Sequence, residues 1–417
     1  MSTSILTSLL LLAASACVAG QTPEVRSLSS TRIMAAEKRV QSDSKSATFY
    51  NELAAAICRK ARDTEDISLY DRASEALDRA LKLSPGNYDA RKLKVVVLLG
   101  RHQFRKALEL AKELIHTTPD DLGVWALLVD VNIALGDYAE AERDAQWVLD
   151  LRPGNTLGFV KAASLREWFG DPEGASEFYH EALRRTSIND LDERAWLCTQ
   201  NARMQLLLGN LKNAAASLDE ARKLDGQSLF AAATLANLRT REGQYAEAAS
   251  LLETRYRAVS SLTNLYDYAE ALHRASKAEQ AAVLFQEFET KADAARNNPY
   301  NANGRLIFYY ADRKRAPEKA LDIARLEMAI RPDCPAMDAY AWALYRARQF
   351  PEAKAQIGRA LAVGVRDAAT FCHASRITAA AGDEKEAKRL ETASHVLDPS
   401  ACPADAQPPE GARAISK

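Results

Sequence analysis

The sequence has no excess of charge of either sign, because 55 Lys and Arg residues oppose 56 Asp and Glu residues and leave a net charge of -1. Binding to the phosphate backbone of nucleic acid needs a basic surface, so we expect no nucleic-acid partner. Long apolar runs are missing too. The uncharged apolar segment 5–16 is shorter than the roughly 20 residues of a transmembrane helix, and we expect no membrane span in the mature chain.

Catalytic motifs are also absent. The sequence contains no Walker loop, no dinucleotide-binding glycine fingerprint, no HExxH and no nucleophile elbow. Acidic pairs such as Asp120 and Asp121 fall at expected helix starts, where the helix dipole favours negative charge. The six histidines show no metal-ligand spacing: His102, His116, His180, His273, His373 and His395. We therefore predict a non-enzymatic protein without a cofactor or a metal.

The first 20 residues are typical of a secretory signal peptide. The apolar segment 5–16 is followed by small residues, so that cleavage after Gly20 or after Ala16 fits. No Lys or Arg precedes Arg26, which is unusual for such a signal. We expect a periplasmic or secreted protein. Two alternatives stay open, a lipoprotein anchored through Cys17 and a cytosolic protein with an apolar N-terminus.

Helical periodicity begins at Ala47 and continues to about residue 400. A small residue recurs near the start of every second expected helix, at intervals of 33 or 34 residues with two intervals of 39. We call these residues the anchor alanines: Ala73, Ala107, Ala141, Ala175, Ala214, Ala248, Ala281, Ala320, Ala353 and Ala387. Such a period predicts stacked helical hairpins, each too small to bury its apolar face alone.

Other marks keep the same phase. A turn glycine precedes several anchors, as at Gly136 and Gly243, and a proline often closes the second helix, as at Pro153. Glycine accepts the left-handed conformation that ends a helix, and proline stops the next one. Ser276 and Arg315 replace the turn glycine in two degenerate units.

The unit at 121–155 resembles a tetratricopeptide repeat, with Trp125, Leu128, the turn Gly136-Asp137-Tyr138 and a closing proline. It departs from the family pattern at Val129. The resemblance implies an all-α, right-handed superhelical solenoid of about ten helix-turn-helix repeats over residues 47–400. We expect a signal peptide at 1–20, a flexible lead-in at 21–46 with a short helix at 32–41, and a disordered tail at 401–417.

In this family the first helices of the repeats line a concave groove. The ligand-facing positions of repeats four to ten carry arginines and aromatic residues: Trp168, Arg203, Asn237, Arg241, Tyr266, Arg274, Arg305, Tyr309, Arg313, Trp342, Tyr345, Arg346 and Arg376. Guanidinium groups bind carboxylates at two points, so we hypothesise an extended acidic or C-terminal partner peptide in the groove. The alternative is that these arginines pair within the chain with Asp267, Glu270, Asp312 and Asp338.

The chain is similar to long exported bacterial tetratricopeptide repeat proteins, which implies a protein-interaction scaffold. A structural subunit of an envelope, secretion or polysaccharide-export complex, acting through its convex face, is the alternative. The known Lys and Asn clamp for C-terminal carboxylates is missing, since Asn237 stands alone beside Ala233. Cys372 lies early in the first helix of the last repeat, and Cys402 follows the second helix of the same repeat. A disulfide between them fits an oxidising compartment, and free buried thiols are the alternative.

Overall fold

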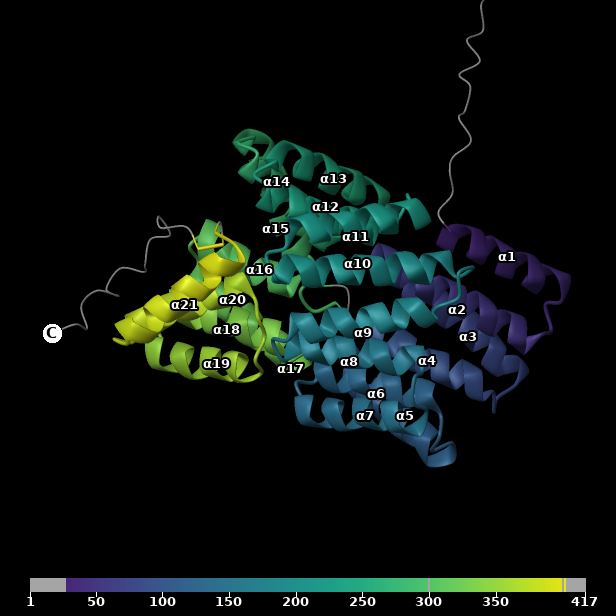
Figure 1. Ribbon diagram of the computed structural model, residues 1–417. Coiled ribbons are helices and arrows are strands. Elements are labelled where there is room, and N and C mark those ends of the chain that lie inside the picture. Colours follow the sequence, from purple (N-terminus) through teal and green to yellow (C-terminus); the bar gives the residue numbers. More distant parts are fainter. Residues whose placement is uncertain (1–27, 299–300, 400, 403–417) are drawn as a thin grey trace, which may run out of the picture.

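The computed structural model describes residues 28–298, 301–399 and 401–402, and this part of the chain is helical without any strand (Figure 1). An N-terminal helix, α1 (Leu28–Ser42), precedes ten hairpins. Their first helices are α2 (Ala47–Thr64), α4 (Tyr88–Gly100), α6 (Leu122–Ala134), α8 (Thr156–Trp168), α10 (Leu191–Leu207), α12 (Leu229–Arg241), α14 (Leu262–Arg274), α16 (Asn303–Phe308), α18 (Cys334–Arg346) and α20 (Ala368–Ala380).

The second helices are α3 (Leu69–Leu83), α5 (Phe104–Thr117), α7 (Tyr138–Leu151), α9 (Pro172–Arg185), α11 (Leu211–Leu224), α13 (Tyr245–Ala258), α15 (Ala278–Ala295), α17 (Pro317–Ile330), α19 (Phe350–Ala362) and α21 (Glu384–Leu397). Each carries one anchor alanine, and all ten anchors are buried. A side chain as small as alanine lets the paired helices approach closely. The predicted solenoid of about ten hairpins is confirmed.

Local sequence explains where the hairpins begin and turn. The Asp121 carboxylate caps α6 by accepting bonds from the N–H groups of Gly123 and Val124. Gly136 ends the same helix with a φ of 73°. Ser276 and Arg315 adopt left-handed φ values of 60° and 51° at the turns where glycine is missing. The degenerate units therefore keep the turn conformation of the regular ones.

Two features differ from the expected organisation. The short helix expected at 32–41 is longer, since α1 spans Leu28–Ser42, where Ile33 and Ala36 are buried. In the eighth hairpin, α16 has only six residues and continues as a short π-helical turn, η1 (Tyr309–Arg313). The expected signal peptide lies outside the described residues, as does the expected tail beyond Cys402.

The solenoid coils so that its C-terminal hairpins pack against hairpins near its middle. The turn at Gly136 lies against the backbone of Pro332, and the turn at Gly170 lies against that of Gly364. Arg241 donates a hydrogen bond to the carbonyl of Leu397, 3.0 Å away. Repeats distant in sequence therefore lie across part of the concave face.

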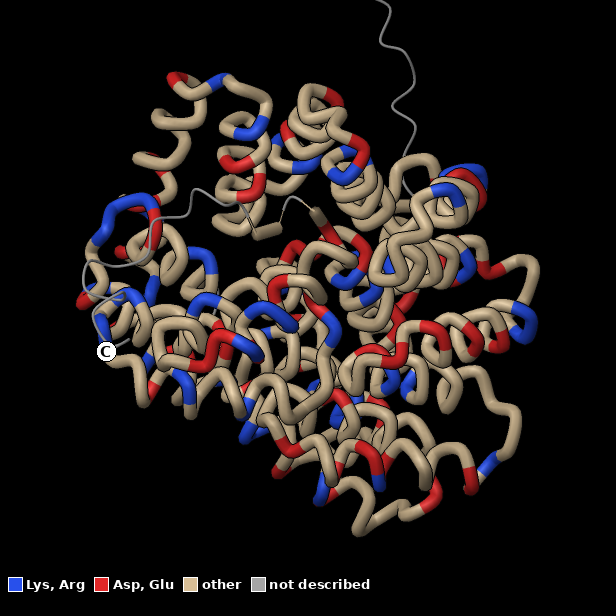
Figure 2. Tube along the Cα trace, turned by 60° about the vertical axis from the view of Figure 1, so that its left-hand side comes forward, with Lys and Arg blue, Asp and Glu red and all other residues tan. Residues whose placement is uncertain are grey.

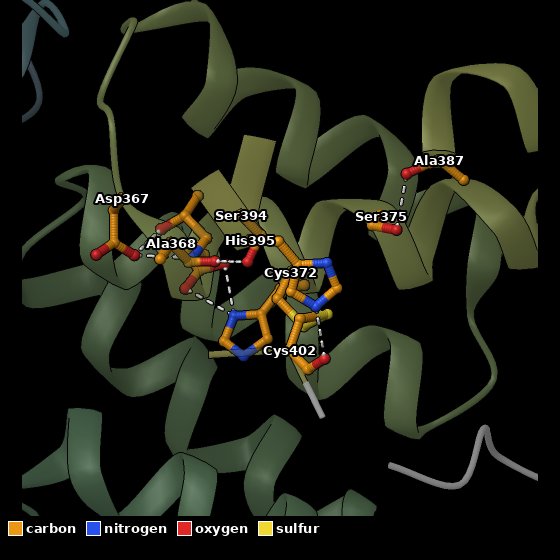
Figure 3. Close-up of a disulfide and its surroundings, with 11 residues drawn as sticks. Asp367, Ala368, Cys372, Ser375, Ala387, Ser394, His395 and Cys402 are labelled. Carbon is orange, nitrogen blue, oxygen red and sulfur yellow. Dashed lines mark hydrogen bonds and ion pairs between the residues drawn. A yellow bond between two sulfur atoms is a disulfide. The ribbon is translucent and has the colours of Figure 1, made fainter. Parts of the chain in front are cut away.

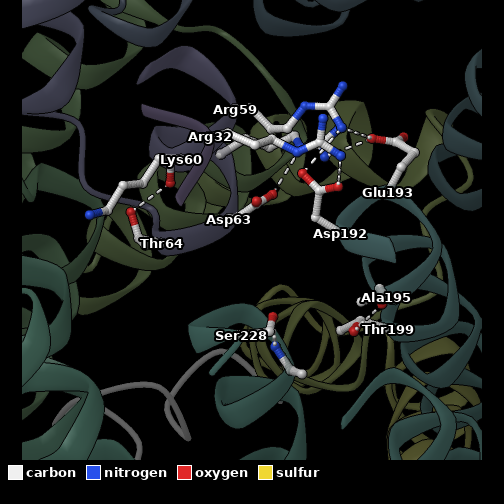
Figure 4. A network of polar contacts seen from close by, with 12 residues as sticks. Arg32, Arg59, Lys60, Asp63, Thr64, Asp192, Glu193, Ala195, Thr199 and Ser228 are labelled. Atoms are coloured by element: carbon white, nitrogen blue, oxygen red, sulfur yellow. Dashed lines mark hydrogen bonds and ion pairs between the residues drawn. The ribbon is translucent and has the colours of Figure 1, made fainter. Parts of the chain in front are cut away.

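Charged side chains join the N-terminal helices to α10 in the same way (Figure 4). Arg32 of α1 and Arg59 of α2 both bind the Asp192 carboxylate, at 2.6 and 3.2 Å. Arg62 binds Glu193 at 2.8 Å. On the molecule as a whole, basic and acidic residues are interspersed rather than gathered on one side (Figure 2). Such pairs fix the coil without creating a surface of one sign.

Candidate partner-binding cavity

A cavity of about 660 Å³ lies inside the coil, and first helices of repeats four to ten contribute to its wall. Residues from α8, α10, α12, α14, α16, α18 and α20 line it, together with Arg255 of α13 and Glu65 directly after α2. Its aromatic lining consists of Trp168, Phe230 and Phe308. Its charged lining consists of Glu65, Glu167, Arg203, Arg241, Arg255, Asp267, Arg305, Asp338, Arg366, Asp367 and His373.

Five of the thirteen predicted groove residues line this cavity: Trp168, Arg203, Asn237, Arg241 and Arg305. The other predicted aromatic residues do not lie in an open groove. Tyr266, Tyr309, Trp342 and Tyr345 are at most 8% exposed and belong to one hydrophobic core. Periodicity gives the helix face correctly, but packing of one repeat on the next buries these rings.

Most of the predicted arginines pair with carboxylates of neighbouring repeats. Arg203 binds Glu167 at 2.6 Å, and Arg305 binds Asp267 at 3.1 Å. Arg313 forms a two-point pair with Glu270, with N–O distances of 2.9 and 2.8 Å. These contacts agree with the alternative of intramolecular pairing.

Three further arginines differ from these. Arg346 donates to the Ala311 carbonyl at 3.1 Å and lies 3.6 Å from the Asp312 carboxylate. Arg274, exposed at the end of α14, has no ion pair within the described ranges. Arg376 is half-buried in α20 and has polar or ring contacts of its own.

Asp338 pairs with a histidine instead of an arginine. His373 Nδ1 lies 3.0 Å from both carboxylate oxygens of Asp338, and its ring stacks on Trp342 with centroids 4.4 Å apart. Burial lowers the pKa of His373, but the charges of Asp338 and Asp312 outweigh burial and raise it. Asp338 and His373 lie 35 residues apart, which is close to the length of one repeat. In the sequence this spacing was the one signal that could have indicated the pair.

Arg241 is the cavity arginine that binds carbonyls rather than carboxylates. Its guanidinium donates to the Leu206 carbonyl at 2.7 Å, to the Leu397 carbonyl at 3.0 Å and to Asn237 Oδ1 at 3.2 Å. Burial lowers its pKa, an effect that Asp398 and Asp367 partly offset. In the described part of the chain no carboxylate forms a salt bridge with Arg241, so its positive charge can attract an anionic group that enters the cavity.

A disulfide joins Cys372 to Cys402, with Cα atoms 5.3 Å apart (Figure 3). It ties the chain after α21 to α20, and His395 Nε2 lies 3.3 Å from the Cys402 carbonyl. Among the described residues, three further cysteines are free and buried: Cys58, Cys198 and Cys334. Burial raises the pKa of the Cys58 and Cys334 thiols to about 12, so these thiols stay protonated and unreactive.

Within the described residues, no group of three His, Cys, Asp or Glu side chains is placed to hold a metal ion. None of the helices described there has the length and apolar character that crossing a bilayer demands. The cavity offers guanidinium groups, carboxylates, an amide and aromatic faces. These groups bind polar peptide segments.

Ten helical hairpins stacked in register define an α-solenoid. A family model described as "Tetratricopeptide repeat" matches residues 69–131. Tetratricopeptide repeat protein 33 of Xenopus laevis is 32% identical over 88 residues, which are 20% of this chain and 34% of that protein. The chain thus spans about a third of the length of that curated relative. This chain is a tetratricopeptide repeat protein.

Solved structures of similar shape include the APC/C hetero-tetramer Cut9–Hcn1, with a TM-score of 0.49 and 13% identity over 87% of this chain and 59% of that chain. The human IFIT1 dimer aligns with a TM-score of 0.48 and 13% identity over 88% of this chain and 94% of that chain. The repeat fold by itself indicates a scaffold for protein–protein interaction.

Proposed function

We propose that this protein is an exported scaffold that holds an extended segment of a partner protein in its central cavity. The supporting observation is that arginine, amide and aromatic side chains from repeats four to ten converge on one cavity of about 660 Å³. This volume lies within the usual range for ligand-binding pockets in proteins. Arg241 and Asn237 supply polar contacts, and Trp168 and Phe308 supply apolar surface.

Export is the second part of the proposal. It is supported by the uncharged segment 5–16 and by the Cys372–Cys402 disulfide, a bond that persists in oxidising compartments. Mass analysis of the native N-terminus tests this part. A chain beginning at Gln21 or Cys17, the latter with or without lipid, agrees with export, whereas an intact Met1 in the cytosol contradicts it.

Capture experiments with matched variants test the cavity. We expect the wild-type protein to retain a partner from envelope extract, and a Trp168→Ala, Asn237→Asp double variant to lose it. Asn237→Asp places a negative charge beside Arg241 and neutralises the cation offered to the partner. Thermal melting followed by circular dichroism verifies that the double variant is folded.

A second candidate function uses the outer layer of helices. A groove of about 460 Å³ lies between α5 and α7 and contains Trp125 and the exposed Trp147, whose ring centroids are 5.8 Å apart. An exposed tryptophan of this kind is typical of an interaction surface. A Trp147→Ala variant that loses the partner, while the cavity double variant keeps it, would favour an assembly subunit that binds through its convex face.

A further inference from the structure

The cavity already holds a carboxylate of the chain itself. Glu65 follows the last residue of α2 and adopts a left-handed conformation, with φ 55° and ψ 27°. Its side chain pairs with Arg255 of α13, which is 190 residues further along the chain. Glu65 lines the central cavity and also a neighbouring cavity of about 450 Å³. It therefore stands where the two spaces meet.

The two partners of this pair differ in accessibility. The Arg255 side chain is 4% exposed, whereas the Glu65 side chain is 52% exposed. Arg255 must keep an anionic partner, because a buried guanidinium without one is strongly unfavourable. Glu65 can return to solvent at little penalty. An incoming carboxylate can consequently take its place on Arg255.

Further cations surround the same carboxylate. Arg255 lies 3.6 Å from Asp267, and Asp267 pairs with Arg305 at 3.1 Å. The pair of Glu65 with Arg255 is therefore the first of three linked ion pairs. Burial lowers the pKa of Arg203, but the charge of Glu167, helped to a smaller extent by that of Glu65, outweighs burial, so that the pKa is raised. The Nε–H of Arg255 is buried without a hydrogen-bond acceptor in the described residues. The present pairing thus leaves one donor of this guanidinium unused.

The backbone at Glu65 is also less favourable than it would be for glycine. A residue with a Cβ atom is strained at positive φ, and the tertiary contact with Arg255 holds this one in place. Loss of that contact lets the end of α2 relax. Strain at Glu65 and exposure of its side chain both favour its replacement by another anion.

We propose that Arg255 is the centre of a carboxylate-binding subsite within the central cavity, and that Glu65 occupies this subsite when no partner is bound. The inference rests on the proposed function of the cavity. It defines the partner segment as one that presents a carboxylate, either an acidic side chain or a chain terminus. Binding then exchanges an internal ion pair for an intermolecular one.

Fluorescence anisotropy tests the subsite with defined probes. A labelled, C-terminally amidated hexaglutamate supplies side-chain carboxylates, and a labelled Gly-Ser peptide with a free C-terminus supplies a terminal one. Amidated hexaglutamine is the neutral probe. We expect Glu65→Gln to bind at least one of the acidic probes roughly tenfold more tightly than the wild type, because the internal competitor is gone. The probe that responds identifies the source of the carboxylate.

Asp66→Asn is the matched control, since it changes the net charge equally and its side chain does not line either cavity. It should bind like the wild type. A Glu65→Gln, Arg255→Gln double variant removes the cation without leaving a buried charge unpaired and should lose the gain. Equal affinity of the acidic probes for the wild type, Glu65→Gln and Asp66→Asn would overturn the subsite while leaving partner capture through Trp168 and Asn237 intact. Retention of the partner by the Trp168→Ala, Asn237→Asp double variant is a separate outcome that rejects the function itself.

Discussion

The Tyr138 hydroxyl accepts a hydrogen bond of 2.9 Å from the backbone N–H of Cys334, 196 residues further along the chain. Tyr138 is also the aromatic residue of the repeat pattern at 121–155. One side chain therefore has two roles, since it packs between the helices of its own hairpin and joins the third hairpin to the ninth. Burial and the neighbouring charges raise the pKa of its phenol, so it stays neutral.

Removal of this hydroxyl should loosen the coil. We expect Tyr138→Phe to lower the free energy of unfolding by about 1–3 kcal/mol, because the Cys334 N–H loses its acceptor in a buried place. Tyr245→Phe is the control, since Tyr245 holds the same place in the sixth hairpin and its hydroxyl makes no such long-range contact among the described residues. Urea unfolding measures both variants. Equal losses would mean that the hydroxyl does not join the two hairpins.

Substitutions at two turn glycines distinguish the effect of backbone strain from that of packing between hairpins. Both Gly136 and Gly243 have positive φ, at 73° and 75°. A Cβ atom at Gly136 would lie 2.5 Å from the Pro332 carbonyl oxygen, whereas one at Gly243 would meet nothing within 4 Å. We expect Gly243→Ala to destabilise the protein by about 1 kcal/mol and Gly136→Ala by clearly more. Thermal denaturation measures the loss of stability in each variant. An equal loss in both would contradict the close approach of Gly136 to Pro332.

Asp144 should make stability depend on pH. Burial raises the pKa of this carboxyl to about 6, although its bond of 2.8 Å from Asn132 opposes the shift. A carboxyl whose pKa is raised in the folded state loses stability as the pH rises from its unfolded value of about 4 through 6. We expect Asp144→Asn to be more stable than the wild type at pH 8, by on the order of 2 kcal/mol.

The same advantage should nearly vanish at pH 4.5, where the folded wild type carries a protonated Asp144. Other acidic residues titrate alike in both proteins and cancel in the comparison. Denaturation midpoints at the two pH values provide the measurement. An advantage that does not change with pH would show that Asp144 is not the titrating group.

The disulfide should stabilise the last hairpin. Cys372 and Cys402 close a loop with a sequence separation of 30 residues, for which chain entropy predicts roughly 3–4 kcal/mol. We expect Cys402→Ser to raise amide hydrogen exchange in α20 and α21, and to make the protein insensitive to dithiothreitol. Wild-type protein treated with dithiothreitol should match the variant. Unchanged exchange in both would contradict a stabilising role.

The sequence by itself determined the class of fold. The anchor alanines, turn glycines and closing prolines repeat within each hairpin, and the contacts that need them are local in sequence. The same phase placed Trp168, Arg203 and Arg305 on the concave face, and all three line the cavity. Neighbouring positions such as Tyr309 and Tyr345 share that phase yet are buried, because the packing of adjacent repeats decides exposure.

Only the tertiary structure decided how the hairpins meet over long distances. Contacts such as Tyr138 with Cys334 and Glu65 with Arg255 depend on small rotations between successive repeats, which accumulate along the coil. No repeat pattern encodes that sum, since insertions near residues 190 and 295 alter it. The helices follow from local periodicity, and the closure of the cavity follows from the geometry of the whole coil.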